Sequence, residues 1–458
     1  MEGLEISEVM LSEIDLGDRI DADYFTKENL FINAELKKHN AVELREFADF
    51  VASAFYPAAT HLYECGDTPF IRCVDCINYP LITKKQDDSF EKIPMWFVED
   101  NDGVNLLNKN DIVITKVGSP CYASIVYEHD VVALSRTVMG LKNIHEINPF
   151  YLLVFFRSKY GFSQLLRARE LTIQYQLTLE RVKRILVYIP NLDFQKSIEN
   201  VVRQSIEKLT LSKTAYSDAE HIILSELGLK DWQPNNAPVN IKQLKVSFLS
   251  SGRLDAEYYQ TKYDELFFRL SKFEYNTINN IATIKKSVEP GSDAYQEIGI
   301  PFIRVSDVTK FGISEPNIFL SPKDFDLAEL QPKKDTILLS KDGSVGIAYK
   351  VEEDMNCITS GALLHLSVFN KDYNLDYLTL VLNSIVVRMQ AERDSNGAII
   401  KHWKPSEIEQ VIIPKLPMPI QETISAKIQE SFALKVESKR LLEEAKLMVE
   451  REIEKGGK

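Results

Sequence analysis

The sequence predicts an α+β protein built from two tandem copies of one plan, each copy ending in a long helix. Three observations predict this fold: an internal repeat, short β-branched runs separated by turn residues, and an apolar stripe at helical spacing at the end of each copy. The 458 residues are 45% hydrophobic and 26% charged, and this length suits roughly three domains, or two domains with long connecting elements. This composition excludes a disordered or collagen-like chain.

The internal repeat is carried by short motifs that recur in the same order. Arg19 to Phe25 (RIDADYF) returns as Arg253 to Tyr259 (RLDAEYY). Because the order is kept and the offset drifts by only a few residues, chance similarity is a poor explanation. The other matched pairs are 68–72 with 300–304, 111–119 with 336–344, 148–152 with 374–378, and 189–195 with 416–421.

Each copy follows the same order of predicted elements. Short strands come first, for example at 111–115 and 336–339, bounded by Gly, Pro, Ser and Asp turns. A helical stretch follows, over 149–167 in the first copy and 375–393 in the second. A polar loop and a Pro/Leu segment then lead into the long helix, since proline breaks regular structure.

The long helices carry one apolar stripe each, from Ile198 to Ile223 and from Ile424 to Ile453, in steps of three and four. Each is about 30 residues, hence roughly 45 Å long. A single stripe needs a partner, and the repeat itself is the most economical one, which predicts an antiparallel coiled-coil pair. The alternative is that each helix folds back onto its own copy.

Domain boundaries follow from these elements and from the linker QPNNAPV between the copies. The predicted order is a globular region 1–195, a long helix 196–228, a linker 229–239, a second globular region 240–419 and a second long helix 420–458.

The net charge is −13, from 54 basic and 67 acidic side chains, so any nucleic-acid surface must be local. Five cysteines do not form a disulfide framework. The acidic start of the chain does not resemble a signal peptide, and no apolar run reaches the length of about 20 residues that spans a membrane. We therefore expect a chain of the reducing cytoplasm without membrane contact.

Motifs of catalysis are missing from the sequence. There is no phosphate-binding P-loop, no dinucleotide fingerprint and no adenine-methyltransferase motif. Cys73 and Cys76 have zinc-like spacing, but they align with Val305 and Val308 in the second copy, which argues against a metal. The sequence therefore favours a binding protein, and two similar domains joined by a helix pair suit DNA, whose half-sites lie at fixed spacings.

The two copies resemble the specificity subunit of type I restriction–modification systems. The resemblance is carried by IPFIR at 300–304, ILLSKDGSVG at 337–346, NGAIIKHWKPSEI at 396–408 and the Pro/Leu-Gln entry into each long helix. It covers nearly the whole chain, and the second copy matches better. The first copy departs where Val117 replaces Asp342 and where the segment RELTIQYQ replaces the Gly397 loop.

The resemblance implies that the globular regions are target recognition domains and that the long helices are spacers. It implies a non-catalytic subunit that binds a bipartite target in double-stranded DNA. Its partners would be two adenine methyltransferase (M) subunits and, where cleavage occurs, two ATP-dependent restriction (R) subunits. No cofactor is expected in this chain, whereas S-adenosylmethionine, ATP and magnesium are expected on the partners. Alternatives are a related two-subunit system in which one partner methylates and cleaves, a self-contained nuclease, and a coiled-coil scaffold without DNA binding.

Candidate DNA-binding residues are cations and amides in loops, because such side chains suit phosphates and base edges. Lys116 and Lys341 precede Gly-Ser turns; the alternative is a solvated lysine beside a turn. The basic loop around Trp403 could instead pack on the base of the helix. Arg72 and Arg304 follow strands and could form ion pairs. The full set is Arg72, Lys116, Ser119, Arg167, Arg169, Gln174 and Gln176 in the first copy, and Lys285, Lys286, Arg304, Lys341, Ser344, Lys401, His402 and Lys404 in the second.

Overall fold

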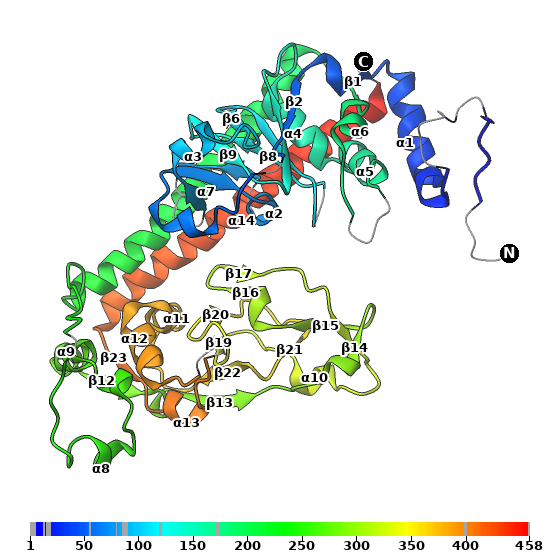
Figure 1. Cartoon of the computed structure of the whole chain (residues 1–458). Helices are drawn as coiled ribbons and strands as arrows, with labels where there is room; N and C mark the ends of the chain where they lie inside the picture. The colour runs from blue at the N-terminus through cyan, green and yellow to red at the C-terminus, as the bar shows by residue number, and fades with distance from the viewer. Residues whose placement is uncertain are drawn as a thin grey trace. The chain divides into compact units, whose positions relative to one another are not determined.

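The computed structural model describes residues 6–11, 14, 20–54, 56–78, 80–84, 90–118, 121–170, 175–237, 239–397 and 401–456 (Figure 1). The chain divides into two compact units. The first unit comprises Met1–Lys208 and Glu437–Lys458, and the second unit comprises Leu209–Val436. The two long helices, α7 (Leu192–Glu226) and α14 (Met418–Lys455), contribute to both units.

In the first unit, the beginning of α7 packs against the end of α14, and Figure 1 shows the green and red ribbons side by side. The Ser205 hydroxyl donates to the Ser438 carbonyl at 2.8 Å, and the Ser438 hydroxyl donates to the Ser205 carbonyl at 2.8 Å. These small buried side chains let the two backbones approach closely. The apolar residues that the two helices contribute to the core of this unit are Ile198, Val202, Ile206, Ala445, Val449 and Ile453.

In the second unit, the end of α7 packs against the beginning of α14. The Ser431 hydroxyl donates to the Ser212 carbonyl at 2.7 Å, and Lys427 lies 3.9 Å from Asp218. Residues later in α7 therefore contact residues earlier in α14. The predicted antiparallel helix pair is confirmed, since the long helix of the first copy pairs with the long helix of the second copy.

The first unit contains two main sheets with strand orders β2-β10-β7-β8-β4 and β5-β3-β9-β6, beside the small β1-β11 pair. The pairs β3–β9 and β4–β8 are parallel and the others antiparallel. The elements are α1 (Lys27–Lys38), β1 (Val42–Glu43), β2 (Asp49–Ala52), β3 (Thr68–Ile71), α2 (Cys73–Asn78), β4 (Leu81–Ile82), β5 (Glu91–Ile93), α3 (Met95–Glu99), β6 (Leu106–Asn108), β7 (Ile112–Thr115), β8 (Ala123–Val126), β9 (Val131–Leu134), β10 (Val138–Lys142), α4 (Pro149–Arg157), α5 (Lys159–Arg167), α6 (Leu179–Lys183) and β11 (Leu186–Val187).

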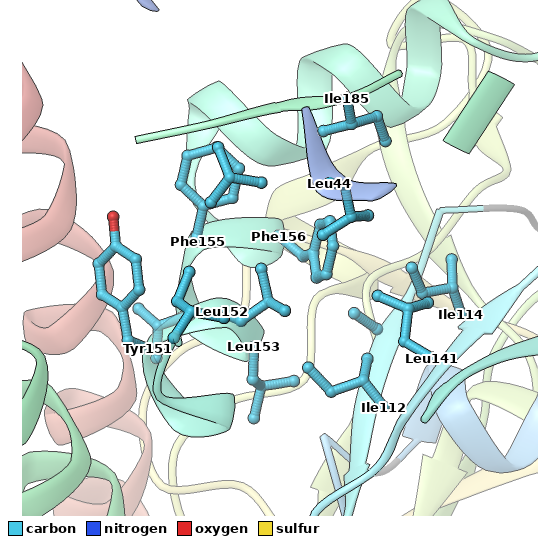
Figure 2. Packing of buried hydrophobic residues seen from close by; sticks show 14 of the residues in the cluster. Leu44, Ile112, Ile114, Leu141, Tyr151, Leu152, Leu153, Phe155, Phe156 and Ile185 are labelled. Atoms are coloured by element: carbon cyan, nitrogen blue, oxygen red, sulfur yellow. The ribbon is translucent and has the colours of Figure 1, made fainter. Parts of the chain in front are cut away.

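Helix α4 forms the centre of the first core, because its residues from Phe150 to Phe156 are all buried. Figure 2 shows Leu153 and Phe156 on the side of the sheet residues, with Tyr151 pointing the other way. The helical stretch predicted over 149–167 is two helices, since Ser158 has extended backbone and accepts at its hydroxyl from the Gly161 amide at the start of α5.

The second unit has the sheets β13-β22-β19-β20 and β14-β18-β15-β21, with the pairs β12-β23 and β16-β17. Its elements are α8 (Phe248–Ser251), α9 (Thr261–Leu270), β12 (Tyr275–Thr277), β13 (Ala282–Lys286), β14 (Tyr295–Gln296), β15 (Ile300–Ile303), β16 (Val308–Thr309), β17 (Gly312–Ile313), β18 (Phe319–Leu320), α10 (Leu327–Leu330), β19 (Thr336–Ser340), β20 (Ala348–Lys350), β21 (Ile358–Thr359), β22 (Leu363–Val368), α11 (Leu375–Asn383), α12 (Ile385–Asp394), α13 (Pro405–Ile408) and β23 (Ile412–Pro414).

The internal repeat has the same hydrogen bonds in both units. A glutamine in the first turn of each long helix accepts a hydrogen bond at its side chain from the backbone amide of an asparagine. Gln195 accepts from Asn148 and Gln421 accepts from Asn374, both at 2.8 Å. Each asparagine in turn caps the next helix, α4 or α11, by accepting from its first amides. The glutamine that ends each Pro/Leu segment therefore ties the long helix to its own domain.

Candidate nucleic-acid interface

Three strand ends of the first unit meet around the loop between β9 and β10. The Lys116 amide, after β7, donates to the Thr137 carbonyl at 2.8 Å. The Cys73 amide, after β3, donates to the Thr137 hydroxyl at 3.1 Å. We call residues 72–75, 116–118, 135–137 and 175–177 the first loop cluster.

The polar segment before α6 closes this cluster. The Leu177 amide donates to the Lys116 carbonyl at 2.9 Å, and Val117 forms a bridge with Gln176. Gly118 has a φ of +89°, which side-chain-bearing residues rarely adopt, so the turn after Lys116 requires glycine. The structure thus brings the predicted Lys116 and Gln176 together.

Lys116 is half-buried, and burial lowers the pKa of its ammonium group. No carboxylate among the described residues forms an ion pair with it. Arg169 lies near this end of the unit, with its guanidinium 4.4 Å from the ring centre of Tyr175. Lys116 therefore keeps its positive charge available for an anion.

Two other predicted cations of the first unit have structural contacts. Arg72 forms ion pairs with Asp75 at 3.3 Å and Glu91 at 3.1 Å, as the alternative interpretation expected. Arg167 lies 3.9 Å from the ring centre of Tyr24, and its Nε donates to the Tyr24 carbonyl. The predicted Ser119 and Gln174 lie outside the described residues.

One exposed cation of the first loop cluster was missed by the sequence interpretation. Arg136 lies in the loop between β9 and β10, and its guanidinium sits over the ring of Tyr56 at 5.1 Å from the centre. The signal available in the sequence was a Ser-Arg-Thr turn between two apolar runs, opposite Ser-Gly-Ala in the second copy.

The second unit builds the same arrangement from the matching strand ends. The Lys341 amide donates to the Ala362 carbonyl at 2.9 Å, as Lys116 does to Thr137. The Trp403 amide donates to the Lys341 carbonyl at 2.8 Å, as Leu177 does to Lys116. We call residues 304–307, 341–344, 360–362 and 401–404 the second loop cluster.

The second loop cluster contains an acidic residue where the first has valine. Asp342 forms an ion pair with Lys341, and its other oxygen lies 2.8 Å from Nδ1 of His402. The Gly343 amide donates to the Lys401 carbonyl at 2.9 Å, which holds the basic segment against the turn. The structure thus brings together Lys341, Lys401 and His402, with Asp342 among them.

The other predicted residues of the second unit also have defined partners. Arg304 lies 3.6 Å from Asp307, and Lys404, which is exposed, lies 3.7 Å from Glu407. The carbonyl of Ser344 accepts from the Ser340 hydroxyl at 2.6 Å. Of the β13 lysines, Lys286 pairs with Glu289 at 2.8 Å, and Lys285 donates to the Glu329 carbonyl at 3.1 Å.

The RLDAEYY motif is a clamp for the loop that leads into the second loop cluster. Arg253 forms an ion pair with Asp255 and donates to the Asp394 carbonyl at 2.9 Å and the Asn396 side chain at 3.0 Å. The Arg393 guanidinium lies over the ring of Tyr258, as Arg167 lies over Tyr24 in the first unit. The contacts of Arg253 therefore give this motif a structural role, in which it holds the loop around Asn396 in place.

Within the described residues, no group of three His, Cys, Asp or Glu side chains could hold a metal ion. In that same part of the chain, no helix is long and apolar enough to cross a membrane.

The family model for the type I restriction modification DNA specificity domain matches residues 37–220 and 271–446, once in each copy of the repeat. The chain belongs to this family. As a type I specificity protein, it has two tandem target recognition domains, each followed by a long helix, and the helices pair antiparallel. No curated protein matches the sequence.

Solved type I subunits are similar to this chain over most of its length. The S subunit from M. genitalium shares 13% identity, with 91% of this chain and 95% of that chain covered and a TM-score of 0.40. The HsdS subunit from Thermoanaerobacter tengcongensis shares 16% identity, with 77% and 81% covered and a TM-score of 0.28.

Proposed function

We propose that this chain is the DNA-binding specificity subunit of a type I restriction–modification complex and performs no catalysis itself. Each unit would read one half of a bipartite target in double-stranded DNA through its loop cluster. The helix pair would fix the gap between the half-sites. The observation that carries the proposal is the loop cluster itself, built twice from the same strand ends with cations at corresponding positions.

The two clusters have the chemistry that DNA recognition needs. Lys116, Arg136, Lys341 and Lys401 supply positive charge for phosphates, and Gln176 and His402 can bond base edges. Because the chain has a net charge of −13, these local cations cannot bind DNA tightly alone. We therefore expect weak, salt-sensitive binding by the isolated chain.

Partners would supply the remaining functions. We propose that two M subunits bind the chain and carry S-adenosylmethionine, and that R subunits with ATP and magnesium join for cleavage. The second domain of a related specificity protein would replace residues 240–419 without loss of assembly, because the core of the first unit contains no residue of that segment.

Methylation mapping tests the proposal. The chain is co-expressed with its cognate methyltransferase in a methylation-free host, and 6-methyladenine is mapped across the genome. A split motif with two half-sites and a fixed gap is expected, and exchange of 240–419 should change one half-site only. Absence of methylation from a complex shown to assemble would contradict the proposal and favour a scaffold.

A further inference from the structure

Arg136 is exposed, but the loop that carries it is fixed from several sides. The Ser135 amide donates to the Ile71 carbonyl at 3.0 Å, and the Ser135 and Thr137 hydroxyls lie 2.7 Å apart. Thr137 also accepts at its carbonyl from the Lys116 amide. Three strand ends therefore fix the backbone on both sides of Arg136.

The side chain of Arg136 is oriented by Tyr56. Its guanidinium lies 5.1 Å from the centre of the Tyr56 ring, and its backbone amide donates to the Tyr56 hydroxyl at 3.3 Å. Tyr56 is only 8% exposed and packs edge-to-face against Phe70 and Phe97. A cation stacked on a fixed ring loses less conformational freedom when it binds.

Within the described residues, the Arg136 guanidinium contacts an aromatic ring but forms no ion pair. In the described part of the chain, no carboxylate pairs with this guanidinium, whereas Arg72 in the same cluster is paired with Asp75 and Glu91. Arginine has five donors in a planar fork, which matches two acceptors side by side. The group is therefore free to form a bidentate contact with a ligand.

The second unit has a glycine at the corresponding position. Gly361 takes the place of Arg136 between Ser360 and Ala362, and a Cβ there would lie 2.6 Å from Cγ of Glu289. Lys286 lies beside it, with Cε 3.0 Å from the same point. The backbone plan of the two clusters is shared, but this position differs completely.

We propose that Arg136 is a base-reading residue of the first unit and binds the O6 and N7 acceptors of one guanine in the major groove. Guanine presents these two acceptors side by side, and arginine is the side chain that matches them. The inference rests on the proposed DNA-binding function and deepens it, because it gives the first half-site a guanine that the second unit does not read in this way.

The test measures binding of the assembled complex with its methyltransferase to duplexes that carry the mapped target. Each guanine is replaced in turn by 7-deazaguanine, which lacks the N7 acceptor. For the wild-type complex, one replacement in one half-site should weaken binding roughly 5- to 100-fold. For R136A, the unmodified duplex should bind as weakly, and that replacement should have no further effect.

Two further variants separate base reading from charge. R136K keeps the positive charge but loses the fork, so it should lose discrimination at the same guanine. R45A removes an exposed arginine of the first unit outside the loop cluster and should leave binding unchanged. Methylation mapping with R136A should show that one half-site relaxes at a single position.

The outcomes distinguish this inference from the proposed function. If the wild-type complex neither binds nor methylates DNA specifically, the proposed function fails. If it reads a split target but R136A binds and methylates as the wild type does, the assignment of Arg136 fails. Uniform weakening of all duplexes by R136A, with the 7-deazaguanine effect retained, would make Arg136 a phosphate contact and also overturn base reading.

Discussion

The two loop clusters share a backbone and differ in charge. In both, the lysine carbonyl after the central strand accepts from the amide of a buried residue, Leu177 or Trp403. In the first cluster, Lys116 has no carboxylate partner among the described residues, while in the second, Asp342 pairs with both Lys341 and His402. The comparison indicates that the backbone contacts build the site and that the side chains set how strongly each unit attracts an anion.

The largest effect should come from removing the buried anchor of either cluster. Trp403 is 1% exposed and packs in the second core, so W403A should lower the free energy of unfolding by about 3–5 kcal/mol. L177A, at the corresponding buried position, should cost about 2–5 kcal/mol. Urea unfolding followed by hydrogen exchange should locate each loss in its own unit.

W403F is the matched control for the second anchor. The Trp403 indole nitrogen is buried and has no acceptor among the described residues, so the smaller phenyl ring removes an unsatisfied donor while keeping part of the packing. We expect less than half of the loss seen with alanine. An equal loss for both variants would mean that the indole nitrogen has a partner that stabilises the loop.

The next effect concerns Asp342 and tests the electrostatic difference directly. D342N removes the negative charge that pairs with Lys341 and His402, so DNA binding through the second unit should strengthen about 5- to 10-fold at low salt. V117D places the same charge beside Lys116 and should weaken binding through the first unit by a similar factor. Titrations at several salt concentrations, with duplexes mutated in one half-site, separate the two units.

D342V tests whether the carboxylate also positions the basic loop. This substitution gives the second loop cluster the valine that the first loop cluster has at Val117. It removes both the negative charge of Asp342 and the hydrogen bonds of its carboxylate. If binding rises as in D342N, the backbone contacts alone hold the loop; if binding falls, Asp342 is needed to orient His402.

A smaller difference should appear in the pH dependence of the two units. Burial lowers the pKa of Lys116 below the usual value of about 10.4, so this side chain loses its positive charge at a lower pH than an exposed lysine. DNA binding through the first unit should therefore weaken as pH rises through the lowered pKa, by a few-fold. K116R should remove this dependence, because arginine stays protonated; a retained dependence would assign it to another group.

The repeat and the long helices could be predicted because they depend on patterns along the chain. Apolar residues at steps of three and four marked α7 and α14, and paired motifs placed Lys116 opposite Lys341. The break at Ser158 was missed, since a single capping hydroxyl interrupts an otherwise continuous apolar stretch. The spacing of apolar residues predicts which residues are buried, but it does not predict that a single residue such as Ser158 has an extended backbone.

The site was only partly predictable, because the partners of a side chain depend on the folded backbone. The sequence placed cations in the loops, but it did not show that Arg167 stacks on Tyr24 or that Asp342 lies between Lys341 and His402. Arg136 was missed because its neighbours Lys116 and Tyr56 are distant along the chain. Loop clusters gathered from several strand ends need the fold before their members can be recognised.

The smallest effect should come from Lys404 at the exposed rim of the second loop cluster. Its ion pair with Glu407 is solvent-exposed, so K404A should change the free energy of unfolding by less than about 0.5 kcal/mol. If Lys404 contacts a phosphate, K404A should weaken binding to all sequences alike and reduce the salt slope of the binding constant by about 0.9. K439A, on the exposed part of α14, is the matched control and should leave the slope unchanged. An unchanged slope for K404A would exclude a phosphate contact by Lys404, whereas altered sequence preference would make Lys404 a base contact.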